Sequence, residues 1–223
     1  NFINWNEYRD KITNNIYSKT GINLEIRGDI KFEILPSPAL KINDIHVANI
    51  EGAMTADTLK IDKLQVSIAF IPLLGRQLKI NNIKLIKPIL NIEVLPDGRN
   101  NLAVAVPSSS NVQPSATPNT IISSQRSKVL NNFIDGLQVG SLSLSIENFS
   151  IQNGFVSYND HIHGRSEKIE ELNGRFSLAS SRGPLESSGD AIIRGMPINY
   201  SLSTGNILKD RTLPLNFSLK SQK

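Results

Sequence analysis

The side chains with the clearest chemical potential lie in one polar segment, Asp160, His161 and His163. Imidazole and carboxylate groups are common zinc ligands, and two histidines separated by one residue would share one face of a strand. A zinc site needs three or four protein ligands, and the neighbouring sequence suggests no further ligand. We therefore expect these residues to form an exposed polar segment and to hold no metal.

Three glutamates, Glu167, Glu170 and Glu171, follow the same segment. A pair of carboxylates at a fixed separation is the catalytic unit of most glycoside hydrolases. These glutamates stand beside a turn, however, which is typical of a solvated run and not of a catalytic pair. The remaining histidine, His46, alternates with apolar neighbours, so we expect its side chain to face solvent.

Other catalytic signatures are absent from the sequence. It contains no G-x-S-x-G elbow, no Walker loop, no G-x-G-x-x-G and no H-E-x-x-H motif. It also has no cysteine, which excludes thiol catalysis, disulfides and cysteine-based zinc sites. We expect no catalytic residue, no enzyme activity and no cofactor.

The charge balance argues against a nucleic-acid-binding protein. The 223 residues carry a net charge of +4, and lysine and glutamate alternate instead of forming a basic block. No segment approaches the roughly 18 consecutive apolar residues that suggest a membrane-spanning helix. Because the chain begins at Asn1 without a methionine or a signal-like segment, we expect a piece of a longer protein.

The longest regular pattern is an alternation of apolar and polar residues from 22 to 34. Strand side chains point to opposite faces with period 2, so one face of this segment is apolar and the other is polar or charged. An unbroken strand here would be about 43 Å long, at about 3.3 Å per residue. A glycine, Gly28, interrupts the apolar row and would allow such a strand to bend. The pattern predicts a long sheet whose apolar face must be covered by something.

A second pattern occurs three times, as LKINDIHV, LKINNIKL and LSIENFSI. In each copy the apolar alternation slips by one residue, which would turn every later side chain to the other face. A bulge or bend at Asn43–Asp44, Asn81–Asn82 and Glu147–Asn148 would return the apolar residues to one face. The repetition favours a repeated strand unit.

Further short strands are predicted at 59–70, 89–95, 154–158, 172–178, 191–194, 199–203 and 214–219, separated by turn signals. The segment 103–127 is rich in proline and serine and reads as a linker or long loop. We expect a mainly β fold, with a long curved antiparallel sheet, one apolar face that forms an open trough, and a short helix after the linker. The expected units are 1–21, 22–102, 103–127 and 128–223, the last one continuing the sheet.

An amphipathic helix is predicted before the first strand. Its apolar stripe is Trp5, Tyr8, Ile12 and Ile16, at helical spacing. Asn4 or Asn6 can cap its start, and Gly21 stands where a helix often ends. Such a helix would pack on the end of the sheet, or else continue from or lie against a membrane.

The segment from Tyr8 to Leu102 resembles the amino-terminal domain of the AsmA family of bacterial envelope proteins. The matching residues, in order, are Tyr8, Thr20-Gly21, Ile26-Arg27-Gly28-Asp29-Ile30, Leu35-Pro36-Ser37-Pro38-Ala39-Leu40, Asn43-Asp44-Ile45, Ile71-Pro72-Leu73-Leu74-Gly75-Arg76, Ile83-Lys84-Leu85, Pro88 and Asp97-Gly98-Arg99-Asn100-Asn101. The family often has a tryptophan after the last asparagine, where this chain has Leu102. Residues from about 128 onward look like the family's continuation, with looser motifs.

This resemblance implies a periplasmic protein, anchored in the inner membrane by a helix that is absent from this chain. It also implies a function in outer-membrane biogenesis. The family is grouped with bridge-like lipid transfer proteins, in which phospholipid acyl chains slide along an apolar trough. Older descriptions of the family stress the assembly of outer-membrane proteins.

Two hypotheses follow. In the first, the chain is a phospholipid-binding or lipid-transfer module; in the second, it is an envelope assembly scaffold that binds other proteins through its sheet edges. The first hypothesis predicts an open apolar groove, and the second a face that is sealed as a core. The predicted lipid-facing residues are Ile22, Leu24, Ile26, Ile30, Phe32, Ile34, Leu40, Ile42, Leu78, Ile80, Ile83 and Leu85.

Overall fold

The computed structural model describes residues 4–34, 38–68, 80–104, 146–178, 185–205 and 215–221. The linker from residue 105 onward, the short helix expected after it and Leu78 of the predicted groove lie outside these residues. The fold of the described residues is mainly β, as predicted. The helical elements are η1 (Trp5–Tyr8), α1 (Arg9–Thr20) and α3 (Asn101–Val104).

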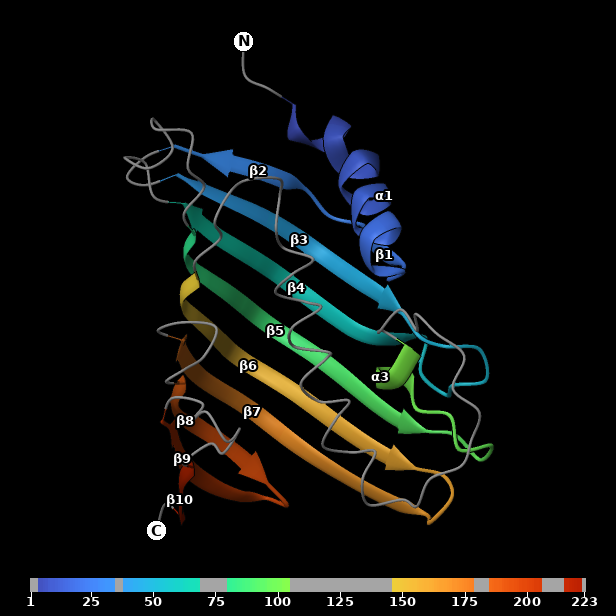
Figure 1. Cartoon of the computed structure of the whole chain (residues 1–223), viewed down its shortest axis with the longest axis vertical. Helices are drawn as coiled ribbons and strands as arrows, with labels where there is room; N and C mark the ends of the chain where they lie inside the picture. The colour runs from blue at the N-terminus through green and yellow to red at the C-terminus, as the bar shows by residue number, and fades with distance from the viewer. Residues whose placement is uncertain are drawn as a thin grey trace.

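All described strands belong to one open sheet (Figure 1). The sheet begins with β1 and β2, which both pair with β3, and then follows chain order to β10 at the opposite edge. The strands are β1 (Leu24–Ile26), β2 (Ile30–Glu33), β3 (Ala39–Ala48), β4 (Asp57–Ile68), β5 (Ile80–Val94), β6 (Ile146–Asp160), β7 (Arg165–Leu178), β8 (Leu185–Ile193), β9 (Met196–Thr204) and β10 (Leu215–Ser221).

The pairing is antiparallel except at one place, where β5 and β6 run parallel. The chain therefore leaves β5 at one end of the sheet and enters β6 at the other, which needs a long connection. The predicted antiparallel sheet is therefore confirmed, with this one parallel pair as an exception that the sequence analysis did not include. The long proline- and serine-rich segment between the two strands was the signal for such a crossover.

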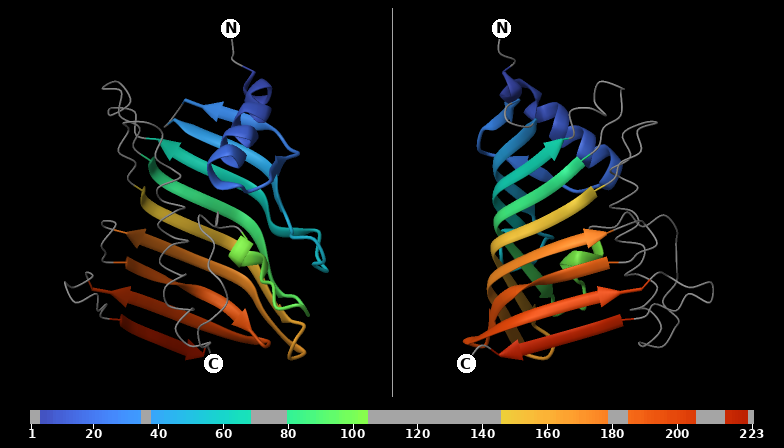
Figure 2. Two further views of the ribbon diagram at one scale, coloured as in Figure 1. Left: turned by 45° about the vertical axis from the view of Figure 1, so that its right-hand side comes forward. Right: turned by 90° about the vertical axis from the view of Figure 1, so that its left-hand side faces the viewer.

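The amino-terminal helix forms at the predicted place and has the predicted ends. The side chain of Asn4 accepts a hydrogen bond from the backbone of Asn6 at the start of η1. Gly21 ends α1 with φ = 70°, a left-handed conformation that glycine adopts without strain. Figure 2 shows α1 lying against the β1–β3 end of the sheet.

The long strand predicted at 22–34 is interrupted, because residues 27–29 separate β1 from β2. The gap is closed by the amino-terminal helix, since Ile30 donates its N–H to Asn6 Oδ1 over 2.9 Å and Arg9 donates to the carbonyl of Gly28 over 2.8 Å. At Gly28 the backbone of Asn43 comes so close that a Cβ would lie 2.7 Å from its carbonyl oxygen. The predicted alternation survives the break, because Ile26 and Ile30 face the same core.

Five long strands carry a pairing irregularity at the same level across the sheet, which we call the bend line. Non-glycine residues there adopt positive φ, and Asp62, opposite them in β4, is left out of the pairing with both neighbours. The positive-φ residues of the bend line are Asp44 in β3, Lys87 in β5, Asn153 in β6 and Glu171 in β7. Figure 2 shows the strands curving strongly along their length.

The slip predicted at Asn43–Asp44 is confirmed, because Ile42 and Ile45 on either side of it belong to one buried core. Opposite Asn81 the pairing shifts between Ser67 and Ile68, at the second predicted slip. The third predicted slip lies at the edge of the described residues, where side chains before Asn148 are not described. The sequence patterns did not reveal the slips at Lys87, Asn153 and Glu171. Because of such a slip, β5 continues through Pro88 as one long strand.

Candidate functional site

Three rows of side chains cross the sheet on the face that α1 packs against, which we call the apolar face. Residues that pair directly across strands point to the same face. The first row is Phe32, Leu40, Val66, Ile83, Phe149, Phe176, Ser187, Leu202 and Phe217. The second is Ile30, Ile42, Leu64, Leu85, Ile151, Gly174, Gly189, Tyr200 and Leu219. The third, beyond the bend line, is Leu24, Val47, Leu59, Leu90, Val156, Ile169, Ile193 and Met196.

At the β1–β4 end the apolar face is covered by η1 and α1. Its centre is a buried cluster of isoleucines, of which Ile26, Ile30 and Ile42 are 3%, 2% and 6% exposed. Trp5 and Ile12 of the helical segment pack against this cluster. The Trp5 ring also lies against Phe32, with ring centroids 5.3 Å apart. This part of the face, from η1 to β4, is the covered end.

From β6 to β9 the same face is less covered, and we call this part the open stretch. Phe149, Ile151, Phe176 and Leu202 remain half-buried. Among the described residues, no apolar side chain of β6, β7, β9 or β10 is fully buried. The rows therefore continue across the sheet while the helical cover does not.

One aromatic side chain of β9 reaches across β8 to β7 in the open stretch. Tyr200 passes so closely over β7 and β8 that a Cβ on Gly174 would lie 2.1 Å from its hydroxyl oxygen, and one on Gly189 would lie 2.8 Å from it. Burial raises the pKa of the Tyr200 hydroxyl. The two glycines therefore leave the space that the Tyr200 side chain occupies.

The predicted groove residues divide between these regions. Within the covered end, Leu24 and Leu40 pack against the isoleucine cluster, as does Leu85 of β5. Ile83 is half-buried at the boundary with the open stretch, Ile22 is half-buried before β1, and Ile34 is exposed at the end of β2. The side chain of Ile80 is not described. Contact of any of them with lipid stays a prediction.

The stripe of the amino-terminal helix is used in packing. Trp5 and Ile12 face the core, Ile16 is half-buried and Tyr8 is exposed, with its ring 5.7 Å from that of Trp5. Of the two interpretations of this helix, the structure shows packing on the sheet.

The sequence prediction did not include the apolar residues of β6 to β9 among the site residues. Phe149 and Ile151 belong to the third copy of the slip motif, which was the available signal for them. Phe176 and Leu202 lie in predicted strands, but their pairing partners are set by long-range register, which short-range patterns do not reveal.

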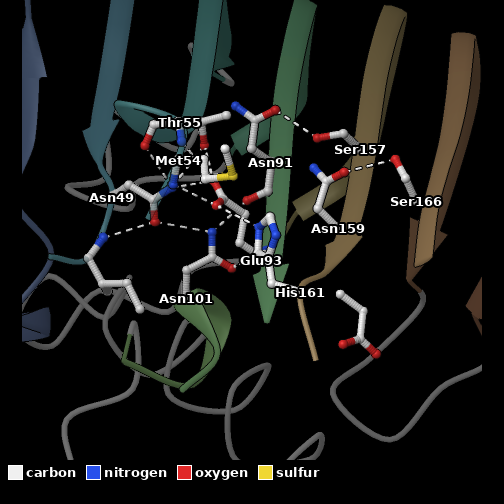
Figure 3. A network of polar contacts seen from close by, with 12 residues as sticks. Asn49, Met54, Thr55, Asn91, Glu93, Asn101, Ser157, Asn159, His161 and Ser166 are labelled. Carbon is white, nitrogen blue, oxygen red and sulfur yellow. Dashed lines mark hydrogen bonds and ion pairs between the residues drawn. The ribbon is translucent and has the colours of Figure 1, made fainter. Parts of the chain in front are cut away.

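A polar network occupies the opposite face where β5 ends (Figure 3). Its centre is Glu93, which is 0% exposed. The carboxylate accepts hydrogen bonds from the backbone of Met54 and Thr55, from the Thr55 hydroxyl and from Asn49 Nδ2. Burial opposes ionisation of Glu93, but these hydrogen bonds outweigh it and hold its pKa below the ordinary value of 4.5.

Asn101 connects this network to α3. It accepts from the backbone N–H of Glu93 over 2.9 Å and donates to the Asn91 carbonyl over 2.7 Å and to Asn49 Oδ1 over 3.2 Å. The carboxylate also faces the β6–β7 turn, where His161 Nε2 lies 3.6 Å away. The network therefore joins the β3–β4 loop, α3 and the β6–β7 turn, and it provides no open site for a substrate.

The histidines differ from the sequence prediction in two respects. His46, expected in solvent, is buried between Asp57 and Asp44, at 2.6 and 2.9 Å. His46 lies on the predicted face, but the left-handed backbone at Asp44 places the Asp44 carboxylate beside Nε2 of the ring. His161 and His163 lie in a turn and do not share a strand face.

The acidic residues near this turn are used in local contacts. His163 contacts Asp160 at 2.7 Å, and this contact holds the pKa of Asp160 below its ordinary value. Glu167 pairs with Arg194, whereas Glu170 and Glu171 are exposed. Within the described residues, no group of three histidine or acidic side chains is arranged to hold a metal ion.

The chain matches the model of a known protein family. The model of the AsmA family matches residues 1–220, nearly the whole chain. No curated protein matches the sequence. Among the helices that the structure describes, none has the length and apolar character needed to cross a bilayer.

Proposed function

We propose that this chain, which belongs to the AsmA family, is a periplasmic module that holds phospholipid acyl chains on its apolar face during lipid transfer. Membership of the family indicates a function in the bacterial envelope. We further propose that the module functions in outer-membrane biogenesis and is attached to the inner membrane by a part of the protein outside this sequence.

The observation that supports this proposal is the continuity of the apolar rows. The row that begins at Phe32 passes through every strand from β2 to β10 by direct pairing and ends at Phe217, with Ser187 as its one polar member. An ordinary core would end where its cover ends. Here the row continues beyond the helical cover, where Phe149, Phe176 and Leu202 are half-buried, Ser187 is buried and Phe217 is exposed.

The chemistry of the rows suits a ligand that slides. Burial of each CH₂ group contributes about 0.8 kcal/mol, so a long acyl chain gains affinity from area alone. Isoleucine, leucine and phenylalanine offer contact without a directional bond, so no single position along the row is strongly preferred.

The test is a charged substitution in the open stretch. Phe149→Glu should remove most co-purifying phospholipid and most uptake of a fluorescent phospholipid, because a carboxylate would stand in the middle of the first row. The fold should persist, since Phe149 is half-buried. Lipid content is measured by mass spectrometry of the gently purified protein, and folding by circular dichroism.

Ser150→Glu is the matched control. It places the same charge one residue away in β6, on the opposite face, because Ser150 pairs with Lys84 and Arg175. This variant should bind lipid like the parent protein. Equal lipid binding by the parent and the Phe149→Glu variant, or the absence of lipid from a folded parent, would contradict the proposal.

A second candidate function is that of an envelope assembly scaffold, and the free edge of β10 favours it. All seven residues of β10 are exposed, and Leu215, Phe217 and Leu219 are 61%, 60% and 53% exposed. A sheet edge of this kind can accept a strand from another protein. Photo-crosslinkers at Asn216 and Ser218 would then trap a protein partner, and crosslinks to lipid alone would exclude this function.

A further inference from the structure

A shallow hollow lies over β5 to β8 on the face opposite the apolar rows. Its polar lining includes Lys84, Asn148, Ser150, Arg175, Ser188 and Asp190. Lys84, Ser150, Arg175 and Ser188 pair directly across four strands, so their side chains point to the same side. The side chains of Phe149 and Ile151, which alternate with these residues in β6, point to the opposite face.

We propose that this hollow binds the phosphate group of a small soluble phosphate ester, between Lys84 and Arg175. Adjacent strands are about 4.8 Å apart, so the backbones that carry these two cations are separated by about 9.6 Å, with Ser150 between them. Lysine and arginine side chains can both reach an anion placed above that serine. Arginine offers a fork of donors to phosphate oxygens, and the hydroxyls of Ser150 and Ser188 add further donors.

The absence of ion-pair partners for Lys84 and Arg175 among the described residues supports this site. At the other end of the same polar row, Lys31 and Lys41 are paired with Asp29 and Glu33 at 3.6 and 2.6 Å. Lys84 and Arg175 form no ion pair with another described residue. The nearby carboxylate of Asp190 accepts a hydrogen bond from Asn173 Nδ2 over 2.9 Å. The hollow therefore holds two cations without a bound counter-ion among the described groups.

The side chains around the hollow favour a soluble phosphate ester over a phospholipid. A phospholipid held here would need apolar area for its acyl chains next to the phosphate site. The described side chains that line the hollow from this face are serine, asparagine, glutamine and charged groups, and the one described apolar side chain beside them is Ile86; Phe149 and Ile151, which also border the hollow, have their side chains on the opposite face. A small phosphate ester without acyl chains fits this surface.

The experiment is a titration of the 223-residue protein with inorganic phosphate and with glycerol 3-phosphate. Amide chemical shifts are followed by NMR at constant ionic strength, with chloride as the replaced anion. Both ligands should shift the signals of β5 to β8, and Lys84→Gln and Arg175→Gln should each weaken binding about tenfold, because each removes a charge-assisted contact. Circular dichroism confirms that each variant is folded.

Lys168→Gln is the matched control, since Lys168 is an exposed lysine of β7, seven residues from Arg175, that does not line the hollow. It should leave both affinities within about twofold of the parent, because a single distant charge acts weakly through salt. An equal loss in all three variants would show non-specific attraction and overturn the proposal. So would a flat titration with both ligands, or binding only to phosphatidylglycerol vesicles, which would indicate a membrane surface.

Discussion

The covered end and the open stretch share the same sheet and the same alternation, but their apolar side chains have different surroundings. At the covered end, Ile30 lies beneath the amino-terminal helix and is 2% exposed. In the open stretch, Ile151 occupies the same row and is half-buried. The alternation thus determines which side chains share a face, and the cover determines whether that face is a core.

The interrupted first strand explains why the cover sits where it does. Two backbone groups at this break bond to the helical segment, the N–H of Ile30 to Asn6 and the carbonyl of Gly28 to Arg9, so the break in β1–β2 is also the attachment point of the helical segment. The irregularities of β6 and β7 have no such partner among the described helices. A bend at one edge of the sheet therefore holds a helix, while the same kind of bend elsewhere only curves the strands.

The largest effect should come from shortening matched isoleucines in the two regions. Ile30→Ala should lower the free energy of unfolding by about 2–5 kcal/mol, because it leaves a cavity in a closed core. Ile151→Ala should cost about 1 kcal/mol, because that side chain is half-buried and water can fill the space. Urea denaturation of both variants measures the two values.

This pair of variants also separates the two proposed functions. If the apolar face were sealed along its whole length in the intact protein, both substitutions would cost similar amounts. Equal losses of unfolding free energy would therefore contradict the distinction between core and open surface. A small loss for Ile151→Ala together with reduced lipid binding would support it.

The sequence predicted the faces better than it predicted the cover. Alternation and the slip at Asn43–Asp44 correctly placed Ile42 and Ile45 on one side. The sequence could not show that Ile26, Ile30 and Ile42 lie beneath a helix, because the position of the helix depends on contacts such as that of Asn6 with Ile30. The residues of β6 to β9 were missed because a parallel pairing across a long connection determines their register.

A second, smaller effect concerns the junction of the two regions at Glu93. Glu93→Gln should lower the free energy of unfolding at neutral pH by about 2 kcal/mol, because a neutral amide replaces a buried acceptor of several hydrogen bonds. Since the folded pKa of Glu93 lies below 4.5, its ionisation stabilises the fold above that pH. That contribution is lost as pH falls through the folded pKa.

Denaturation measured from pH 7 to pH 3 tests both statements. The parent protein should lose more stability than the Gln variant on acidification, so the two curves should converge. Parallel curves would show that Glu93 does not titrate with folding. Glu170→Gln is a suitable control, because it makes the same change at an exposed glutamate of β7 that lies outside this network.

The smallest effect should come from the bend line, where the two regions have similar backbone but different side-chain contacts. Glu171 of the open stretch has φ = 49° and is exposed, so Glu171→Gly should relieve left-handed strain of about 1–2 kcal/mol. The flexibility of glycine in the unfolded chain costs about 0.5–1 kcal/mol, which leaves a net stabilisation of about 0.5 kcal/mol. Glu170 has no left-handed φ to relieve, so Glu170→Gly should destabilise the protein.

Asp44 of the covered end has a similar φ, 51°, but its carboxylate contacts the buried His46 at 2.9 Å. Asp44→Gly should therefore destabilise the protein, because the loss of a partner for a buried nitrogen exceeds the relief of strain. Urea denaturation of the three glycine variants shows whether each substitution raises or lowers the free energy of unfolding. If Asp44→Gly and Glu171→Gly stabilised the protein equally, the contacts at the covered end would add nothing to the bend, and the two regions would differ only in their helical cover.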